Sequence, residues 1–225
     1  MIRGAGFDLD NTLYDQDQHA FSFFGEASWL LAQETGVPAA QIQTCFLRKW
    51  RELTSRHPRF FDEVLATLGC RRPDLIVPLV DLYHHHRAAL SLYPGARQVL
   101  DTLGGKMPLF LVTDGDAGMQ RTKVAALGIE EDFGAIVYTS ELGPGHQKPD
   151  VLPFQVAAER LGVSPGHCVY VGDNPNHDFA GARRAKMTTV RVFSGPFAGE
   201  AAATGCDADH AVGSLAELPA LFFGR

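Results

Sequence analysis

The chain has 225 residues, 45% of them hydrophobic, and a formal net charge of −6. This length suits one mid-sized domain, or a core domain with a smaller insert. The acidic balance argues against a nucleic-acid-binding surface, because such a surface needs clustered Lys and Arg to neutralise phosphates. No stretch approaches the roughly 20 apolar residues of a membrane span, and residues 1–6 lack a signal-peptide layout, so we expect a cytoplasmic protein without a membrane partner.

The four cysteines lie far apart in the sequence, at Cys45, Cys70, Cys168 and Cys206. They form no C-x-x-C pair, and their spacing matches neither a zinc site nor the disulfide framework of a small secreted domain. We therefore expect reduced thiols that fill core or surface positions.

The first segment, residues 2–7, is short and apolar and predicts a buried strand that ends at the acidic run 8–12. From about residue 15 to residue 90, apolar residues recur at helical spacing and no convincing strand is present. The apolar stripes begin at Phe21, Ile42, Phe60 and Leu79. They predict four amphipathic helices that form a small bundle.

From residue 93 onward, strand and helix patterns alternate. Strands are predicted at 108–112, 135–138, 168–171 and 188–192, and helices at 96–103, 119–127, 151–161, 179–185 and 214–221. Ser214 and Glu217 predict a capping box at the start of the last helix. Such alternation is typical of an α/β protein whose parallel sheet is covered by helices on both faces.

Polar side chains follow three of the predicted strands at the point where each strand ends. Asp8 and Asp10 follow the strand at 2–7, Thr113 and Asp114 follow the strand at 108–112, and Asp173 closely follows the strand at 168–171. Ligands of open α/β sheets bind beyond the carboxyl ends of the strands. We therefore expect these side chains to meet at one edge of the sheet.

Asp8 and Asp10 are two residues apart, so both carboxylates point to the same side of an extended chain. One carboxylate can bind a metal and attack phosphorus to form an aspartyl-phosphate, while the other protonates the leaving group and later deprotonates a water. Because a phosphate monoester is already negative, a divalent cation must screen the attack. Magnesium (Mg2+) suits this role, because it prefers oxygen ligands such as carboxylates.

Further side chains can supply the rest of such a site. Asp173 and Asp178 offer carboxylates for the cation, and Thr113 offers a hydroxyl to a phosphoryl oxygen. Backbone N–H groups around Asp114 add donors, and Lys148 supplies a positive charge that holds nucleophile and phosphate together.

Four segments carry a resemblance to a known family. They are residues 7–12 (FDLDNT), 109–113 (LFLVT), 148–150 (KPD) and 172–178 (GDNPNHD). In this order they resemble the four motifs of the haloacid dehalogenase-like (HAD) superfamily, and the resemblance covers nearly the whole chain. It implies a Rossmann-like parallel-sheet core flanked by helices, residues 1–14 and 92–225, and an inserted α-helical cap domain of the C1 type, residues 15–91.

The resemblance also implies a role for each acidic residue of the motifs. Asp8 would be the nucleophile and Asp10 the general acid/base. Mg2+ would be held by the Asp8 carboxylate, the Asp10 backbone carbonyl and Asp173. Asp178 would act on the metal through a water, or would orient the other ligands.

The phosphoryl group would be bound by Thr113 and Lys148, together with Asp114. Asp114 stands where the family often has Asn. If Asp114 acts through its backbone N–H, this difference matters little, whereas a carboxylate that faces the phosphate would weaken binding.

The resemblance and the roughly 75-residue helical insert predict hydrolysis of a small phosphorylated metabolite, with the cap closing over the substrate. Three alternatives stay open. A 2-haloacid dehalogenase of the same superfamily needs no Mg2+, but such enzymes lack the second Asp of D-x-D, which is present here as Asp10. A sugar phosphomutase is compatible with Asp10 and the cap. A non-catalytic phospho-acceptor switch would lack the long insert.

Other side chains of the insert have simpler interpretations. For the run 84–86 (HHH) we expect a solvated helix face rather than a shared metal ion, because consecutive helix positions point in different directions. Most aromatic residues of the insert should form the core of the bundle, although they are also candidates for a substrate pocket. Arg56 and Arg59 are candidates for contact with an anionic substrate tail.

Overall fold

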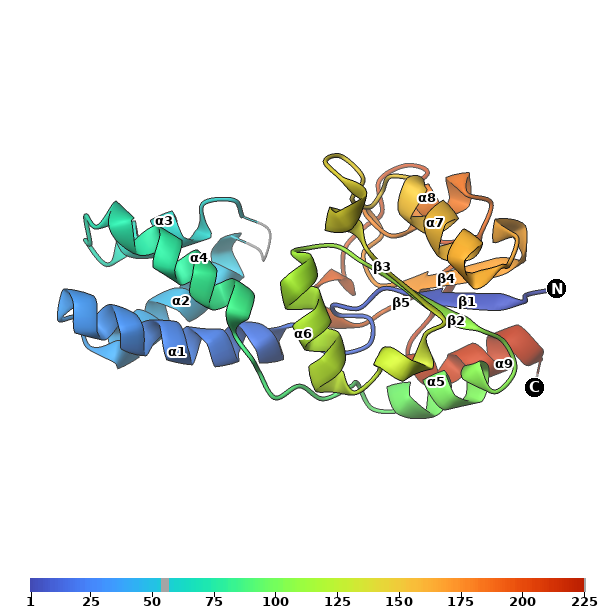
Figure 1. Cartoon of the computed structure of the whole chain (residues 1–225), viewed down its shortest axis with the longest axis horizontal. Helices are drawn as coiled ribbons and strands as arrows, with labels where there is room; N and C mark the ends of the chain where they lie inside the picture. The colour runs from blue at the N-terminus through green and yellow to red at the C-terminus, as the bar shows by residue number, and fades with distance from the viewer. Residues whose placement is uncertain (54–56, 225) are drawn as a thin grey trace. The chain divides into compact units, whose positions relative to one another are not determined.

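The computed structural model describes residues 1–53 and 57–224, and the chain divides into two compact units. The first, which we call the sheet unit, comprises Met1–Gln16 and Leu90–Arg225. The second, the helical unit, comprises Asp17–Ala89. The helical unit is therefore one continuous insertion into the chain of the sheet unit (Figure 1).

Within the described residues, the sheet unit contains one parallel sheet of six strands in the order β3-β2-β1-β4-β5-β6. The strands are β1 Gly4–Phe7, β2 Leu109–Thr113, β3 Ala135–Tyr138, β4 Cys168–Gly172, β5 Thr188–Val192 and β6 His210–Val212. The first five match the predicted strands, and the α/β class is confirmed. β6 was not predicted, because it has only three residues and two of them, His210 and Ala211, are exposed.

Helices cover both faces of this sheet, as Figure 1 shows. α5 (Ala96–Gly104), α6 (Ala117–Leu127) and α9 (Leu218–Phe223) share a hydrophobic core with one face. α7 (Leu152–Leu161) and α8 (Phe179–Arg184) share a second core with the opposite face. This Rossmann-like arrangement buries both faces of the sheet, which explains why its strands read as continuous apolar runs.

The central strand β1 is held closely by its neighbours. Successive side chains of a strand point to opposite faces, so in β2 Leu111 faces the first core and Phe110 the second. A Cβ atom at Gly6 would lie 2.1 Å from the Phe110 ring, so the position opposite Phe110 has room only for glycine. Phe7, which precedes Asp8, is fully buried, and such burial stabilises the fold by about 2 to 3 kcal/mol.

The last helix differs from the prediction. Instead of one helix over 214–221, a 3-10 turn spans Leu215–Glu217 and α9 begins at Leu218. Pro219 lies in the first turn of α9, where a residue without an N–H is tolerated. The predicted capping box between Ser214 and Glu217 is confirmed.

The described part of the helical unit contains four α-helices at the positions of the four apolar stripes. They are α1 Asp17–Thr35, α2 Ala39–Leu53, α3 Phe60–Thr67 and α4 Ile76–His85. Aromatic rings dominate their common core, in which Phe24 stacks on Phe46 with 5.0 Å between ring centroids. Trp29 is an exception to the expected burial, because 65% of it is exposed.

His86 contradicts the predicted solvated face for the histidine run. Its ring is buried just beyond the end of α4, whereas His85 is exposed. One ring nitrogen, Nδ1, lies 2.6 Å from Oε2 of Glu26, and the other, Nε2, lies 2.9 Å from Oγ of Ser22. These contacts tie the end of α4 to α1, because the chain leaves the helix at His86 and the ring turns inward.

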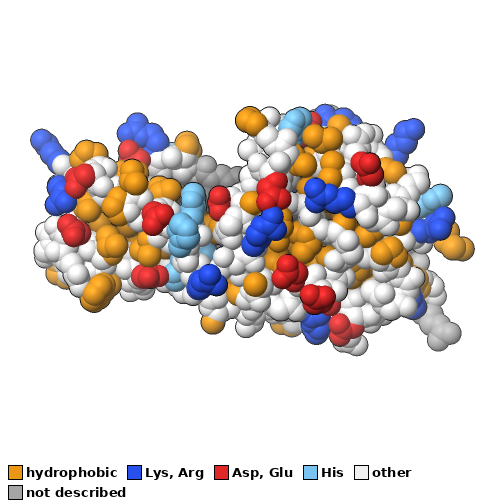
Figure 2. Space-filling model, in the orientation of Figure 1, with side chains coloured by type: hydrophobic (Ala, Val, Ile, Leu, Met, Phe, Trp, Pro, Cys, Tyr) orange, Lys and Arg blue, Asp and Glu red, His pale blue; other side chains and the backbone are white. Residues whose placement is uncertain are grey.

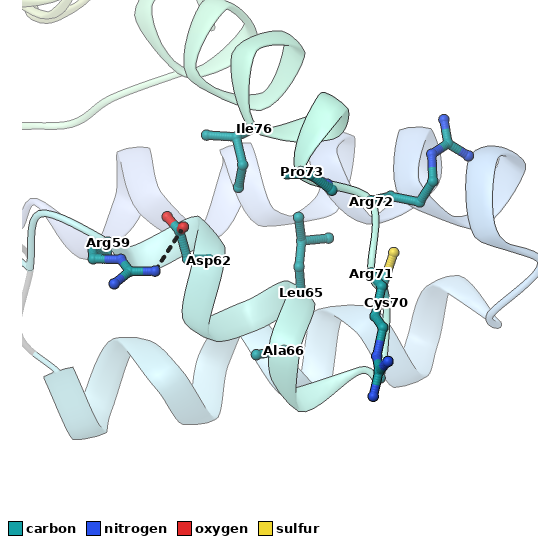
Figure 3. A pocket seen from close by; sticks show the side chains of 10 residues that line it. Arg59, Asp62, Leu65, Ala66, Cys70, Arg71, Arg72, Pro73 and Ile76 are labelled. Atoms are coloured by element: carbon teal, nitrogen blue, oxygen red, sulfur yellow. Dashed lines mark hydrogen bonds and ion pairs between the residues drawn. The ribbon is translucent and has the colours of Figure 1, made fainter.

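Described residues of the helical unit line several hollows, and two of these include candidates for substrate contact. Figure 3 shows a groove of about 480 Å³. Its lining includes Arg59, which donates a hydrogen bond to Asp62. A smaller pocket of about 170 Å³, which we call the aromatic pocket, has this lining: Phe23, Phe24, Trp50, His57, Pro58, Phe60, Phe61, Val80, Tyr83 and His84. Arg56, the other candidate for an anionic substrate tail, lies outside the described residues.

The visible surface carries charges of both signs. Figure 2 shows Lys and Arg side chains interspersed with Asp and Glu side chains on this face. Over residues 1–53 and 57–224, no helix is both long enough and apolar enough to cross a membrane.

Candidate active site

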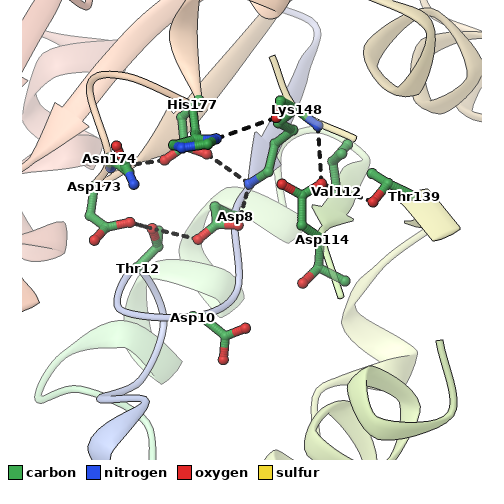
Figure 4. Close-up of polar contacts among 12 residues, drawn as sticks. Asp8, Asp10, Thr12, Val112, Asp114, Thr139, Lys148, Asp173, Asn174 and His177 are labelled. Carbon is green, nitrogen blue, oxygen red and sulfur yellow. Dashed lines mark hydrogen bonds and ion pairs between the residues drawn. The ribbon is translucent and has the colours of Figure 1, made fainter. Parts of the chain in front are cut away.

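The ends of three neighbouring strands bring the first, second and fourth motifs together. β1 lies between β2 and β4, and Phe7 pairs with Leu111 on one side and with Val171 on the other. Asp8, Thr113 and Asp173 therefore lie at the same edge of the sheet, where Figure 4 shows Asp8 and Asp173. This follows from the parallel register, which aligns the carboxyl ends of the strands.

Lys148 reaches this edge from the loop before α7 and is almost completely buried. Its ammonium Nζ lies 2.5 Å from Oδ1 of Asp8, 2.7 Å from Oδ1 of Asp178 and 3.3 Å from the hydroxyl of Tyr170. An ammonium has three hydrogens to donate, and here each has an acceptor. Burial alone would lower the pKa of Lys148, but the charges of Asp178 and Asp8 hold it well above its ordinary value.

Asp178 approaches Asp8 because the fourth motif folds tightly. Its Oδ2 accepts a hydrogen bond of 2.9 Å from the backbone N–H of Asn174. A Cβ atom at Gly172 would lie only 2.5 Å from this same Oδ2, so the glycine of the motif leaves the space that the carboxylate occupies. The one-residue step from Gly172 to Asp173 then carries a second carboxylate to the same edge.

Three carboxylates form a buried cluster. One oxygen from each of Asp8, Asp173 and Asp178 can be chosen so that all three lie within 4.8 Å of one another. Burial, together with repulsion from Asp178, raises the pKa of Asp8 to about 7 despite the neighbouring Lys148. Burial, with repulsion from Asp178 and Asp8, raises the pKa of Asp173 to about 9.

This cluster fits a divalent cation. Three carboxylates face the single ammonium of Lys148, so the ionised cluster has two negative charges in excess. Oδ2 of Asp173 is buried and has no hydrogen-bond partner among the described residues. A cation with oxygen ligands would balance the charge and give that oxygen a partner. Thr12 joins the cluster through hydrogen bonds of 3.3 Å to Asp8 and Asp173.

The side chain of Asp10 lies apart from this cluster, and its carboxylate is directed away from Asp8 in Figure 4. Its oxygens accept hydrogen bonds from the hydroxyl of Tyr14 at 2.5 Å, from Nε2 of Gln120 at 2.9 Å, and from Nζ of Lys123 at 2.8 and 3.1 Å. Burial alone would raise the pKa of Asp10. The Lys123 charge and these hydrogen bonds outweigh burial, and the pKa lies below its ordinary value.

Gln120 and Lys123 were missed by the sequence analysis. Both lie on α6, three residues apart, and both are buried. The available signal was a polar pair on the helix face that carries Val124 and Leu127 toward the core, a position where an unpaired Lys is rarely found. A buried lysine on such a face indicates a carboxylate partner.

Thr113 and Asp114 have different surroundings. Thr113 is 1% exposed, and its hydroxyl accepts a hydrogen bond of 2.5 Å from Nε2 of Gln120. Oδ1 of Asp114 accepts from the Thr139 hydroxyl at 2.8 Å and from the backbone N–H of Lys148 at 3.1 Å. The Asp114 carboxylate thus anchors the loop that carries Lys148, a use that the sequence analysis did not consider.

Comparison with known proteins identifies relatives over most of the chain. A family model described as haloacid dehalogenase-like hydrolase matches residues 2–186. A protein of Methanopyrus kandleri named glyceraldehyde 3-phosphate phosphatase is 35% identical over 203 residues, which cover 88% of this chain and 86% of the relative.

Solved structures share the fold over nearly the full length. A HAD phosphatase from Thermococcus onnurineus superposes with a TM-score of 0.70 at 24% identity, covering 100% of this chain and 99% of that chain. A 2-haloacid dehalogenase from Pseudomonas syringae pv. Tomato DC3000 superposes with a TM-score of 0.67 at 26% identity, covering 97% of both chains. The resemblance inferred from the four motifs is thus confirmed.

Proposed function

The chain belongs to the haloacid dehalogenase-like hydrolase family and is a phosphoric monoester hydrolase, and we propose that it cleaves small-molecule phosphate monoesters with Mg2+ through a phosphorylated Asp8. The observation that carries this proposal is the buried contact between Lys148 and Asp8 beside Asp173 and Asp178. This contact places the candidate nucleophile beside the ammonium of Lys148, at the sheet edge where the carboxylate cluster carries excess negative charge.

Asp8 attacks phosphorus in the first step. A bond forms between an Asp8 oxygen and phosphorus while the bond from phosphorus to the leaving oxygen breaks, and Asp10 gives that oxygen its proton. In the second step a water attacks the phosphorus of the aspartyl-phosphate and Asp10 takes a proton from it. The Asp8 carboxylate and inorganic phosphate are then released, so the atoms and charges of both steps balance.

The phosphoryl group is held by donors that surround Asp8. The Lys148 ammonium lies against the attacking carboxylate, so it can also balance the negative charge of the incoming phosphate. The Thr113 hydroxyl and the backbone N–H groups of Leu9 and Asp114 are the further donors in this proposal. Mg2+ would be held by the carboxylates of Asp8 and Asp173 and by the backbone carbonyl of Asp10, and it supplies Lewis-acid screening of the phosphoryl oxygens.

The helical unit acts as a cap in this proposal. We assign it the exclusion of bulk water and the selection of the leaving group, as for the predicted domain of residues 15–91. The aromatic pocket supports the second role, because half-exposed rings such as those of Phe61 and Tyr83 offer apolar contact area. Glyceraldehyde 3-phosphate, named for the Methanopyrus relative, is the first substrate to test.

Dehalogenation is the second candidate, because the Pseudomonas 2-haloacid dehalogenase shares the fold at 26% identity. A halide leaves without a proton, so that reaction needs no acid at the position of Asp10. The carboxyl group that a proton-transferring phosphatase requires is present as Asp10 and is held in place by four hydrogen bonds, and this favours the phosphatase instead.

The test is a panel of phosphorylated metabolites, with inorganic phosphate measured in Mg2+ and in excess chelator, and with 2-chloropropionate as the competing substrate. We expect phosphate release that requires Mg2+ and that is lost in Asp8→Asn. Chloride release without a metal, or phosphate release that chelation leaves unchanged, would contradict the proposal.

A further inference from the structure

We propose that Gln120 and Lys123 are positioning residues that hold the Asp10 carboxylate and the Thr113 hydroxyl in place for phosphoryl transfer, an inference that rests on the proposed function. The two side chains project from α6 at positions i and i+3, which share one helix face. A helix of 11 residues fixes them more firmly than a loop would.

Lys123 forms an ion pair with Asp10. Its side chain is 5% exposed, and an ammonium removed from water in this way requires a carboxylate partner. Nζ contacts both oxygens of Asp10, at 2.8 and 3.1 Å. Because Lys148 serves Asp8 and Asp178, the site has a separate cation for the acid/base carboxylate.

Gln120 joins Asp10 to Thr113. Its Nε2 donates to Oδ2 of Asp10 at 2.9 Å and to Oγ1 of Thr113 at 2.5 Å. An ionised carboxylate has no hydrogen to donate, so the Gln120 amide must turn its NH2 group toward Asp10. The same NH2 group then donates to Thr113. The Thr113 oxygen already accepts, so its own hydrogen must point elsewhere. Gln120 therefore turns the Thr113 hydroxyl into an oriented donor for a phosphoryl oxygen.

The same contacts explain how Asp10 can stay in place while it exchanges a proton. A carboxylate has about four acceptor directions, and the bonds from Tyr14, Gln120 and Lys123 occupy all four. Loss of the longer Lys123 bond, at 3.1 Å, frees one direction on Oδ2. Tyr14 and Lys123 still hold Oδ1, and Gln120 still holds Oδ2, so the carboxylate stays fixed while the freed direction takes a proton.

The decisive experiment compares leaving groups. The alkoxide that leaves glyceraldehyde 3-phosphate needs a proton from a positioned acid. The 4-nitrophenolate that leaves 4-nitrophenyl phosphate is a stable anion and departs without one. We expect Lys123→Met and Gln120→Met to lower kcat/KM for glyceraldehyde 3-phosphate, or for the best alkyl phosphate of the panel, at least about tenfold more than kcat/KM for 4-nitrophenyl phosphate. Lys123→Arg should recover part of the loss, because it restores the cation.

Arg121→Met is the matched control, because Arg121 is an exposed cation of α6 that pairs with Glu141. It should leave both kcat/KM values unchanged. Equal losses on both substrates in Lys123→Met would overturn the positioning role, since a general structural defect has no preference for a leaving group. A wild type that hydrolyses neither ester would instead refute the proposed function.

A double-mutant cycle protects the test against poor folding of Lys123→Met, whose Asp10 would be buried without its cation. Asp10→Asn removes that charge, so the variant that carries both substitutions avoids the unpaired carboxylate. If Lys123 acts through Asp10, adding Lys123→Met to Asp10→Asn should change kcat/KM by less than about threefold. A further loss as large as that in the wild-type background would contradict the inference.

Discussion

Nζ of Lys148 lies 2.5 Å from Oδ1 of Asp8, and this buried contact links the loop before α7 to the residue that follows β1. The contact is part of a shared arrangement, because the same ammonium lies 2.7 Å from Asp178. Lys148 thus both neutralises the candidate nucleophile and holds the carboxylate cluster together.

Replacing Lys148 should abolish most of the activity. In Lys148→Met we expect kcat to fall by about 10² to 10³, because the phosphoryl group loses a preorganised cation in a water-excluded site. Steady-state kinetics with Mg2+ measures this loss. Lys106→Met is a suitable control, because Lys106 lies over the Phe223 ring at the protein surface. A Lys148→Met enzyme with near-wild-type kcat would remove Lys148 from the mechanism.

Mg2+ affinity should rise with pH between about pH 6 and pH 9. In the metal-free protein the raised pKa values of Asp8, about 7, and Asp173, about 9, mean that both carboxyls hold protons at low pH. Binding must displace those protons, so affinity is lowest below the lower pKa and increases as each group ionises. Calorimetry in buffers of different ionisation enthalpy measures the released protons. Binding without proton release near neutral pH would contradict this linkage.

The same pKa shifts fix the sign of the stability change in the metal-free protein. Folded Asp8 and Asp173 retain protons that the unfolded chain, with ordinary pKa values near 3.8, has already lost. The contribution of these groups to the free energy of unfolding therefore falls as pH rises from about 4 toward 9. Mg2+ should reverse this trend, because it binds the ionised carboxylates of the folded state.

Gly172→Ala should displace the Asp178 carboxylate, because the substitution adds a Cβ atom beside it. Its Cβ would lie 2.5 Å from Oδ2 of Asp178, so the carboxylate must move away from Lys148. We expect destabilisation of about 1 to 3 kcal/mol in denaturant unfolding, together with a loss of activity. Gly199→Ala serves as the control, because a Cβ at Gly199 meets nothing within 4 Å. Equal behaviour of the two variants would show that Asp178 tolerates displacement.

Asp114 should be replaceable by Asn but not by Ala. The amide oxygen of Asn can accept the same two hydrogen bonds, from Thr139 and from the backbone of Lys148, so we expect Asp114→Asn to keep kcat/KM within about threefold. Asp114→Ala loses both bonds, and at about 1 kcal/mol each we expect a fall of about tenfold or more. Similar rates in Asp114→Ala and the wild type would exclude the anchoring role.

Sequence reasoning succeeds here where local pattern and global topology agree. Asp8, Thr113 and Asp173 each follow a strand, and parallel register carries strand ends to one edge, so their convergence follows from order along the chain. Gln120 and Lys123 follow no strand, and although their spacing places them on the apolar face of α6, only the tertiary packing of that helix brings them to Asp10. The spacing of residues along α6 does not reveal which residue of another element these side chains contact.

Other differences have local causes. β6 is too short and too exposed to produce a strand pattern, and it forms because β5 offers an open edge for pairing. His86 belongs to a run of histidines that reads as solvated surface, yet the chain turns at the end of α4 and the ring meets Glu26 and Ser22. In both cases a neighbouring element decides the outcome.

The most direct test of the central claim is to locate the transferred phosphoryl group. The enzyme would be mixed with glyceraldehyde 3-phosphate, or with the best substrate of the panel, quenched during turnover and reduced with borohydride, which converts an aspartyl-phosphate to homoserine. We predict that peptide mass spectrometry finds this conversion at position 8 and nowhere else, and not in Asp8→Asn. Conversion at another carboxylate, or full turnover by Asp8→Asn, would contradict the account.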